Sequence, residues 1–435
     1  MMSTVENALS ENQAVEKKAV NYKVILGASL GNGLEIFDFT VYSFFAAIIG
    51  ELYFPSDTAY GSLLMSVAVF GVGFIMRPLG SMVLGAYADK VGRKAAMLMT
   101  IILMGVGTAL IAFSPTHAQI GVFAPILIVV GRLIQGFAAG GEVGSATTLL
   151  LESAGANQRG FFVSWQSINQ GISALLGASF GLLLTYFLSE EALYSWGWRV
   201  PFIIGLLIIP VGVYIRRHLE ETYGGEAPGQ ARSPSNPVLD VLRNHFKDLL
   251  LGVLIIMSGT VMVYIVLLYM PTYMMQTYHI AGPTAYLFSC IASVVQIAAA
   301  YYAGRYVDRV QNYKRPLLFS IFAALILIYP TFWFLSATQS LWLAIVFRIL
   351  LIGTLGINML ASTMLIVSAL PRHVRATGTS MIYAFGVTLF GGSAQLIVTW
   401  LLDVSGNPMA PAWYVTGMLT LSLIATCLFR ERHQD

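Results

Sequence analysis

Residues 60–94 read YGSLLMSVAVFGVGFIMRPLGSMVLGAYADKVGRK. Residues 60–86 are mostly apolar, and Arg77 is the one charged residue among them. A helix of about 20 apolar residues is long enough to cross the hydrocarbon core of a membrane. Residues 87–94 then bring three basic side chains and one acidic side chain. The stretch therefore predicts a transmembrane helix that ends in a positively charged loop.

The same pattern recurs along the whole chain. Of the 435 residues, 57% are hydrophobic and 10% are charged, whereas about 25% are charged in a soluble domain. This composition excludes a soluble protein and predicts an all-α integral membrane protein with twelve transmembrane helices. The twelve apolar windows are residues 24–50, 60–86, 95–114, 119–150, 160–188, 199–215, 248–276, 284–307, 316–336, 341–368, 376–402 and 411–430.

The windows form two sets of six, separated by a polar segment that is rich in glycine and proline. Such a segment cannot bury enough apolar surface to fold alone, so we expect it to be a linker. The expected domains are a cytoplasmic tail over 1–23, a six-helix bundle over 24–215, a cytoplasmic linker over 216–247, a second six-helix bundle over 248–430 and a short cytoplasmic tail over 431–435.

The basic residues predict the orientation of the chain. Of the 24 Lys and Arg residues, 20 lie in the N-terminal tail, in every second loop or after the last window. The intervening loops hold Arg199, and Arg77, Arg132 and Arg348 lie inside windows. Because Lys and Arg near the ends of spans accumulate on the cytoplasmic side, we expect both termini in the cytoplasm.

The two sets of windows also share residues at a nearly constant offset. The offset is 219 for the residues after the second and eighth windows and 216 for the others. This spacing predicts a duplicated, pseudo-symmetric pair of bundles, an arrangement that places a substrate site at the midplane between them. The matched pairs are Gly85 and Gly304, Asp89 and Asp308, Arg132 and Arg348, and Arg159 and Arg375.

The loop over residues 85–94, GAYADKVGRK, resembles the loop between helices 2 and 3 of the major facilitator superfamily. An aspartate in this loop can accept charge-assisted bonds from neighbouring helix ends. In the second half, Gln-Asn-Tyr over 311–313 stands in place of Gly-Arg-Lys, so we expect a weaker gate there. The resemblance implies gating roles for Gly85, Asp89, Gly92, Arg93, Asp308 and Arg309.

Four further segments narrow the resemblance to the metabolite:proton symporters of that superfamily. They are GNGLEIFDF over 31–39, FIMRPLG over 74–80, RLIQGFAAGGE over 132–142 and WGWRVPF over 196–202. Residues 84–89, 164–167 and 208–210 are similar to the citrate and tricarballylate proton symporters in particular. The resemblance implies proton-coupled uptake of a citrate-like di- or tricarboxylate across a bacterial inner membrane. The net charge of +3, the two cysteines in apolar runs and the missing motifs lead us to expect no nucleic-acid partner, metal or cofactor, and we expect a monomer.

Six ionisable residues lie inside the windows, and each is a candidate functional group, because burying a charge in a membrane is costly. They are Glu35, Asp38, Arg77, Arg132, Glu142 and Arg348. With three acids and three arginines, an added substrate carboxylate would favour proton uptake by a nearby acid. We expect Asp38 or Glu35 to carry the proton, with Glu142 as a further candidate. Alternatively, these charges form structural ion pairs, and coupling to sodium also stays open.

Substrate binding is expected to depend first on an arginine, because a guanidinium binds a carboxylate through two parallel hydrogen bonds. Arg77 is the first candidate, and Arg132 either joins it or pairs with Asp38 and releases it on protonation. Polar side chains on one face of the fifth window and in the second half complete the expected site. They are Gln166, Asn169, Gln170, Tyr269, Tyr273, Arg348, Asn358, Tyr383 and Gln395.

The sequence also bears on other classes of function. All six histidines fall in loops or at window ends, and neither a zinc-protease motif nor a phosphate-binding loop occurs, so we do not expect an enzyme. Symport of a zwitterionic osmolyte such as proline or betaine is the main alternative. A drug exporter would carry a Gly-Pro pair in the fifth window, and this chain has none there. A receptor built on the same fold would bind its ligand without accumulating it in the cell.

Overall fold

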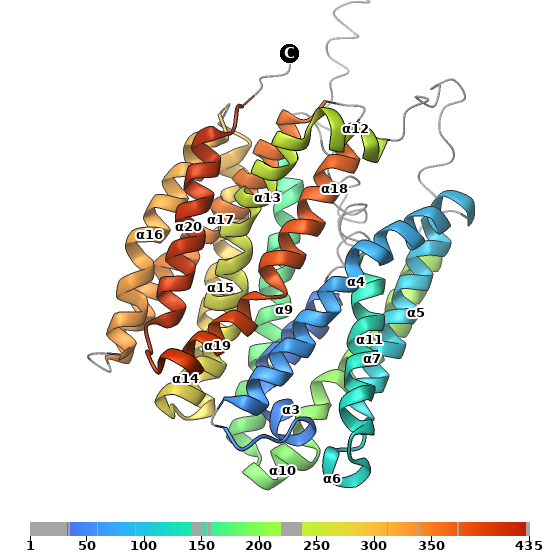
Figure 1. Ribbon diagram of the computed structural model, residues 1–435, viewed down its shortest axis with the longest axis vertical. Helices are drawn as coiled ribbons and strands as arrows, with labels where there is room; N and C mark the ends of the chain where they lie inside the picture. Colours follow the sequence, from blue (N-terminus) through green and yellow to red (C-terminus); the bar gives the residue numbers. More distant parts are fainter. Residues whose placement is uncertain are drawn as a thin grey trace, which may run out of the picture.

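The computed structural model describes residues 33, 35–58, 60–91, 93–140, 150, 154, 158–218, 237–310, 312–336, 340–371 and 374–431. These residues are almost entirely helical, and they contain no β-strand. The long helices run roughly along one axis as two bundles that stand side by side (Figure 1). We call the end at which the chain terminates the upper end, and the opposite end the lower end.

The first bundle is built from the N-terminal half of the chain. Its first span is the segment Glu35–Phe44, which meets the next helix at an angle of 67°. The helices that follow are α3 (Ala46–Tyr53), α4 (Gly61–Val91), α5 (Arg93–Ala112), α6 (His117–Ile120), α7 (Phe123–Gly140), α9 (Arg159–Phe187), α10 (Glu190–Ser195), the 3-10 helix η1 (Gly197–Arg199) and α11 (Val200–His218).

The second bundle holds two π-helical segments inside long spans. Its helices are α12 (Pro237–Asn244), α13 (Phe246–Val261), the π-helix η2 (Met262–Tyr269), α14 (Met270–Tyr278), α15 (Gly282–Val307), α16 (Lys314–Ser336), α17 (Leu341–Ala369), α18 (Arg375–Gly386), the π-helix η3 (Val387–Gly391), α19 (Ala394–Ser405) and α20 (Ala410–Leu428). The end of the segment predicted to be a linker is therefore helical, because α12 buries Val241 against the bundle.

The described part of the chain holds nine helices that are long and apolar enough to cross a membrane, or ten when the bent pair at Glu35–Phe44 and Ala46–Tyr53 is counted as one span. Two shorter apolar helices, Leu98–Ala112 and Gly197–Leu207, fall in the third and sixth predicted windows. The all-α membrane fold expected from the sequence is thus present, and every predicted window contains an apolar helix.

Close packing between α4 and α7 depends on glycines. A Cβ at Gly136 would lie 1.7 Å from the backbone oxygen of Gly73, and a Cβ at Gly140 would lie 2.0 Å from that of Arg77. Small residues at a spacing of four allow two membrane helices to approach closely. Because α7 also carries Arg132, this contact fixes two arginines of neighbouring helices beside each other.

The two bundles meet along α9 and α15 and along α4 and α19. At the lower end, Tyr286 Oη of α15 donates to the carbonyl of Phe44 at 2.7 Å, and Thr272 Oγ1 of α14 donates to that of Ser43 at 3.5 Å. Toward the upper end, α4 and α5 diverge from α18 and α13 (Figure 1). The lower end of the first span is therefore bonded to the second bundle.

Candidate functional site

Arg77 and Glu35 form a buried ion pair between α4 and the first span. Arg77 Nη2 lies 3.2 Å from Glu35 Oε1, and the side chains are 9% and 3% exposed. A buried pair of opposite charges compensates much of the cost of removing each from water. Two of the six charges predicted at membrane depth are therefore partners of each other in this conformation.

Asp38 is tied to Arg132 through the amide of Gln135. Arg132 Nη1 donates to Gln135 Oε1 at 2.7 Å, and Gln135 Nε2 donates to Asp38 Oδ2 at 3.3 Å. Thr108 Oγ1 of α5 also donates to Asp38 Oδ2. The hydrogen bonds of the Asp38 carboxylate thus come from neutral groups, and the nearest arginine acts on it through one intervening side chain.

Aromatic rings surround both arginines of the first bundle. The guanidinium carbons of Arg77 and Arg132 lie 4.8 Å and 4.5 Å from the centre of the same Phe39 ring. Rings of the first span and of α4 complete the shell, with Tyr42 and Phe70 over Arg132 and Phe74 over Arg77. Cation–π contacts stabilise a guanidinium more strongly where water is excluded, so the shell supports two buried positive charges close together.

One edge of the Arg132 guanidinium has no hydrogen-bond partner. Its Nε and Nη2 are both buried and without a partner, whereas Nη1 is held by Gln135. Nε and Nη2 donate in the same direction, and this pair of donors matches the two oxygens of a carboxylate. Arg132 is 0% exposed, so a ligand reaches this edge only after the helices around it move.

Two tyrosines of the second bundle lie near the cluster formed by Glu35, Asp38, Arg77, Arg132 and their aromatic shell. The Tyr264 ring of η2 lies 5.5 Å from the ring of Phe74 and 6.0 Å from that of Phe70. Tyr264 and Tyr383 are both close enough to Arg77 to interact with its charge. Tyr383, one of the second-half residues predicted to bind substrate, therefore lies near an arginine of the first bundle.

Other predicted second-half residues make contacts elsewhere. Tyr269 Oη is hydrogen-bonded to Thr399 at 2.7 Å, and Tyr273 Oη donates to the carbonyl of Pro408 at 2.5 Å. Both tyrosines thus bond within the second bundle, as packing residues do. Asn358 accepts from Ser258 Oγ at 3.1 Å and keeps a buried Nδ2 without a partner.

Gln395 bridges the two bundles. Its Nε2 donates to Ser43 Oγ of the first span at 2.7 Å and to the carbonyl of Tyr264 at 3.3 Å, and its Oε1 is buried without a partner. The amide therefore connects the first span to the π-helix η2. This position suits a residue that senses the relative placement of the bundles.

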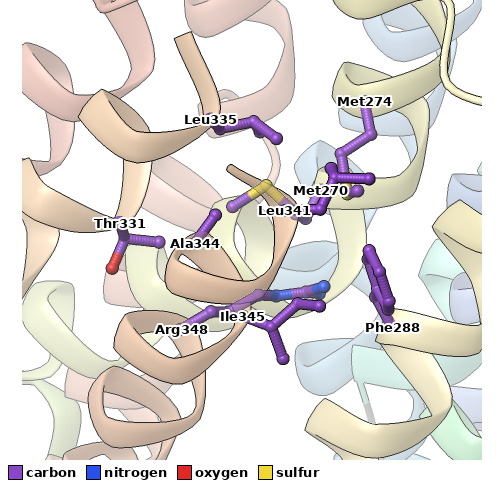
Figure 2. A pocket seen from close by; sticks show the side chains of 9 residues that line it. All are labelled: Met270, Met274, Phe288, Thr331, Leu335, Leu341, Ala344, Ile345 and Arg348. Atoms are coloured by element: carbon purple, nitrogen blue, oxygen red, sulfur yellow. The ribbon is translucent and has the colours of Figure 1, made fainter. Parts of the chain in front are cut away.

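Arg348 lines a separate pocket, and all the residues around this pocket belong to the second bundle (Figure 2). It donates to the carbonyls of Val266 and Leu267 at 3.2 and 3.5 Å and to Ser289 Oγ at 3.4 Å. Although Arg132 and Arg348 match in sequence, the structure gives them different surroundings, an aromatic shell for one and backbone carbonyls for the other.

The predicted amides of the fifth window lie on α9. Gln166, Asn169 and Gln170 are half-buried, and Asn169 Nδ2 is buried without a hydrogen-bond partner. Glu142 lies outside the described residues, so its predicted role in proton coupling stays a prediction. In the part of the chain that the structure describes, no group of three His, Cys, Asp or Glu residues is placed to hold a metal ion.

The predicted gate residues occupy the upper end. Gly85 and Asp89 lie in the last turns of α4 and Arg93 begins α5, whereas Gly92 falls outside the described residues. Arg309 directly follows Asp308 and is exposed. The end of α4 and the start of α5 therefore lie at the upper end (Figure 1), and the gating roles stay predictions.

Asp308 joins the bundles at the upper end. Its Oδ1 accepts from the backbone N–H of Gly160 at 2.6 Å and its Oδ2 from that of Phe161 at 2.9 Å. A carboxylate at a helix N-terminus is stabilised by the unpaired N–H groups and by the helix dipole. Burial raises the pKa of Asp308, and the two N–H groups act in the opposite direction. The second-half loop thus makes a specific contact with α9 despite its divergent sequence.

Replacing Asp308 by asparagine is expected to open the upper end between α9 and α15, because the amide NH₂ cannot accept from a backbone N–H. The readout is maleimide labelling of a cysteine at Ser164, which is buried against Gly304, with both native cysteines changed to serine. Labelling should become several times faster. Asp403→Asn removes an exposed acid and should leave the rate unchanged, and an equal rate in both variants would contradict the expectation.

Several residues of the cluster were not predicted from the sequence. Gln135, Thr108 and Tyr264 carry no charge and were not singled out as candidates. The sequence did contain a signal for Gln135. This residue lies three residues after Arg132 and so shares its helix face, which makes it a possible hydrogen-bond partner of the arginine. For Thr108 and Tyr264 the sequence offers no comparable signal, since their roles depend on how α5 and η2 pack against the first span.

Comparison with known proteins agrees with this architecture. The Major Facilitator Superfamily model matches residues 28–394. A solved structure of a D-xylose-proton symporter superposes with a TM-score of 0.76 at 17% sequence identity, covering 93% of this chain and 97% of that one. At this level of identity the likeness concerns the fold alone.

Relatives of similar length carry two kinds of name. Proteins named citrate-proton symporter are 32% identical, one from Klebsiella pneumoniae over 94% of this chain and 91% of its own, and one from Salmonella typhi over 98% and 97%. A Staphylococcus aureus protein provisionally named proline/betaine transporter is also 32% identical, over 95% of this chain and 88% of its own. With this family match and these relatives, the chain belongs to the Major Facilitator Superfamily and is a membrane transporter, not an enzyme.

Proposed function

We propose that this transporter takes up a small di- or tricarboxylate of the citrate class together with protons, by alternating access. The observation that carries the proposal is the unpartnered Nε and Nη2 edge of Arg132, which lies close to Asp38 in a buried aromatic shell. This edge fits a carboxylate in geometry and charge. The two relatives named citrate-proton symporter support the same substrate class.

Asp38 is the proposed proton carrier. A carboxylate surrounded by neutral donors and buried at membrane depth is costly when charged, and a bound proton removes that cost. A substrate carboxylate that binds Arg132 neutralises its positive charge. The Asp38 carboxylate, which is linked to Arg132 through Gln135, then loses part of the stabilisation that this charge provides. Proton uptake by Asp38 then balances the added charge, which couples the two movements.

Gln135 is the proposed positioning residue between these two events. Its amide now donates to Asp38 and accepts from Arg132. Once Asp38 carries a proton, its hydroxyl is a donor, and the Gln135 amide is free to turn. The turn releases Arg132 Nη1 from Gln135 Oε1, and the arginine can follow the substrate.

The upper end is the proposed cytoplasmic side of a bacterial inner membrane, as the distribution of basic residues indicates. Both termini then lie in the cytoplasm, and the bonds at Ser43 and Phe44 close the external side. We propose that the unit is a monomer, because both bundles and the candidate site belong to one chain.

A zwitterionic osmolyte is the second candidate substrate, and the relative provisionally named proline/betaine transporter favours it. A quaternary ammonium group binds to free aromatic faces. Here Phe39, Tyr42 and Phe70 already face Arg132. The aromatic shell is therefore filled by guanidinium groups, which favours an anion over betaine.

Uptake by proteoliposomes separates these candidates. The purified chain is reconstituted, an inward proton gradient is imposed without sodium, and radiolabelled citrate uptake is measured with an excess of unlabelled citrate, tricarballylate, succinate, proline or betaine. We expect accumulation that needs the gradient and competition by the carboxylates. Competition by proline or betaine alone would replace the proposal by osmolyte transport, and a strict need for sodium would replace proton coupling.

Replacing Arg77 by alanine is expected to weaken citrate binding by about tenfold, because the site loses one of its positive charges while the negative charge of Glu35 stays. Thermal stabilisation by citrate measures this, since a ligand that binds the native state stabilises it. The double variant Arg77→Ala/Glu35→Gln also removes the negative charge of Glu35 and should recover part of the affinity. Undiminished affinity in the single variant would contradict this role for the ion pair.

A further inference from the structure

The second bundle contains a buried arginine whose charge no acid balances in the described part of the chain. In the first bundle each arginine is linked to an acid, Arg77 directly and Arg132 through Gln135. Arg348 is 4% exposed, and none of the described carboxylates forms an ion pair with it or acts on its charge. A cation at membrane depth without an anion is costly. The imbalance points to an anion that no described side chain supplies.

One nitrogen of Arg348 has no partner. Its Nε donates to the carbonyl of Val266 at 3.2 Å. Its Nη2 donates to the carbonyl of Leu267 at 3.5 Å and to Ser289 Oγ at 3.4 Å. Its Nη1 is buried and makes no hydrogen bond. An anion at Nη1 therefore leaves the bonds of the other two nitrogens in place, so its binding requires no rearrangement of η2 or α15.

Arg348 lines a small pocket between α14, α15, α16 and α17. The volume of the pocket is about 20 Å³, and Figure 2 shows the guanidinium directed toward Phe288, another residue of its wall. A space of roughly 10–15 Å³ is enough for one water molecule. The pocket therefore has room for a water molecule or a single atomic ion, and not for a larger anion such as a di- or tricarboxylate.

The rest of the wall is apolar apart from one hydroxyl. That hydroxyl belongs to Thr331, and it already donates to the carbonyl of Leu327 at 2.7 Å. Met270 and Met274 contribute polarisable side chains. Apolar surroundings screen charge weakly, so an unbalanced guanidinium attracts an anion more strongly here than in water. A water molecule at the same place would bond to Nη1 but would leave the charge unbalanced.

We infer that this pocket binds one monatomic halide anion, chloride, at Arg348 Nη1. Chloride fits the volume, supplies the missing negative charge and accepts a charge-assisted hydrogen bond. Because a single nitrogen is the donor, we expect an affinity in the millimolar range. All the residues around the pocket belong to the second bundle, so this anion is a resident of that bundle and not a transported ion.

Thermal unfolding of the purified full chain at increasing chloride concentration tests the inference, since an ion that binds the native state stabilises it. Sodium gluconate is exchanged for sodium chloride at constant ionic strength. The unfolding temperature of the wild type should rise with chloride and reach a plateau, and bromide should act in the same way. A wild type that shows no saturable response would overturn the inference, because the pocket then holds water.

Two variants change the pocket in different ways. Arg348→Gln removes the charge, and Ala344→Val fills part of the space without removing the guanidinium. Each should raise the apparent Kd for chloride by at least about tenfold. Arg348→Lys restores a positive charge and should recover part of the response. Val346→Leu changes an exposed position on the same helix and should respond as the wild type does.

Arg132 is a second place where chloride can bind, because its Nε and Nη2 have no partner. Titration of Arg132→Gln separates the two places. The response should persist in Arg132→Gln and be lost in Arg348→Gln. The reverse pattern would place chloride at the transport site and overturn the inference, as would a wild-type response in Ala344→Val. If Arg348→Gln does not fold, Ala344→Val decides. Neither citrate nor transport enters these measurements, so the result is independent of the proposed function.

Discussion

Asp38→Asn is expected to abolish proton-driven accumulation while leaving exchange of substrate across the membrane. An asparagine keeps the size of the side chain and accepts from Thr108 and Gln135, but it cannot bind and release a proton. A gradient of about two pH units corresponds to roughly 2.7 kcal/mol, or ~100-fold accumulation. The variant should lose this accumulation entirely. Uptake and counterflow of citrate in the same proteoliposomes measure the two activities.

Glu35→Gln is the matched control for this result, because it neutralises the other acid on the same face of the first span. Glu35 is paired with Arg77, so its replacement should lower affinity without removing the dependence on pH. If Glu35→Gln abolishes accumulation and Asp38→Asn retains it, the proton carrier is Glu35. A thermal unfolding curve for each variant shows that loss of transport does not reflect loss of the fold.

Arg132→Gln is expected to remove high-affinity binding of carboxylates. The variant loses both donors of the free edge and leaves a bound carboxylate without its counter-charge, a loss of ~3–5 kcal/mol for a buried pair. This corresponds to a rise in Kd of more than about 100-fold. Isothermal titration of citrate into the purified variant measures it. Wild-type affinity in Arg132→Gln would assign anion binding to Arg77 instead.

Arg132→Lys provides the graded control. An ammonium restores the positive charge but not the pair of parallel donors, and it does not stack on Phe39 as a planar guanidinium does. We expect affinity between those of wild type and Arg132→Gln. Equal affinity in the lysine and glutamine variants would show that the geometry of the donor edge, more than the charge, determines binding.

The fold was predictable because the membrane imposes strong rules on sequence. Spans must be long and apolar, and basic residues mark the ends of every second span. Every predicted window contains an apolar helix, and the duplicated residues indicated two bundles. The 67° bend between Glu35–Phe44 and Ala46–Tyr53 and the π-helices η2 and η3 were not predicted, because they depend on packing against the opposite bundle.

The candidate site was predictable only in part. Charges inside apolar windows identified Asp38, Arg77 and Arg132, since each carries a high cost of burial. Their partners were not predictable, because the choice between a direct pair and a relay through Gln135 depends on side-chain conformation. Arg348 illustrates the same limit. Its sequence match to Arg132 suggested a shared role, yet its surroundings depend on the carbonyls that η2 exposes.

The contact of Asp308 with α9 has a consequence for how the chain is made. The carboxylate that completes the first turn of α9 lies 148 residues further along the sequence than Gly160. During synthesis, the N-terminal half therefore leaves the ribosome before Asp308 has been made. Until then, the backbone N–H groups of Gly160 and Phe161 at the start of α9 lack this acceptor. Two separately expressed halves should recognise each other at this point, with the late-made half completing the early one.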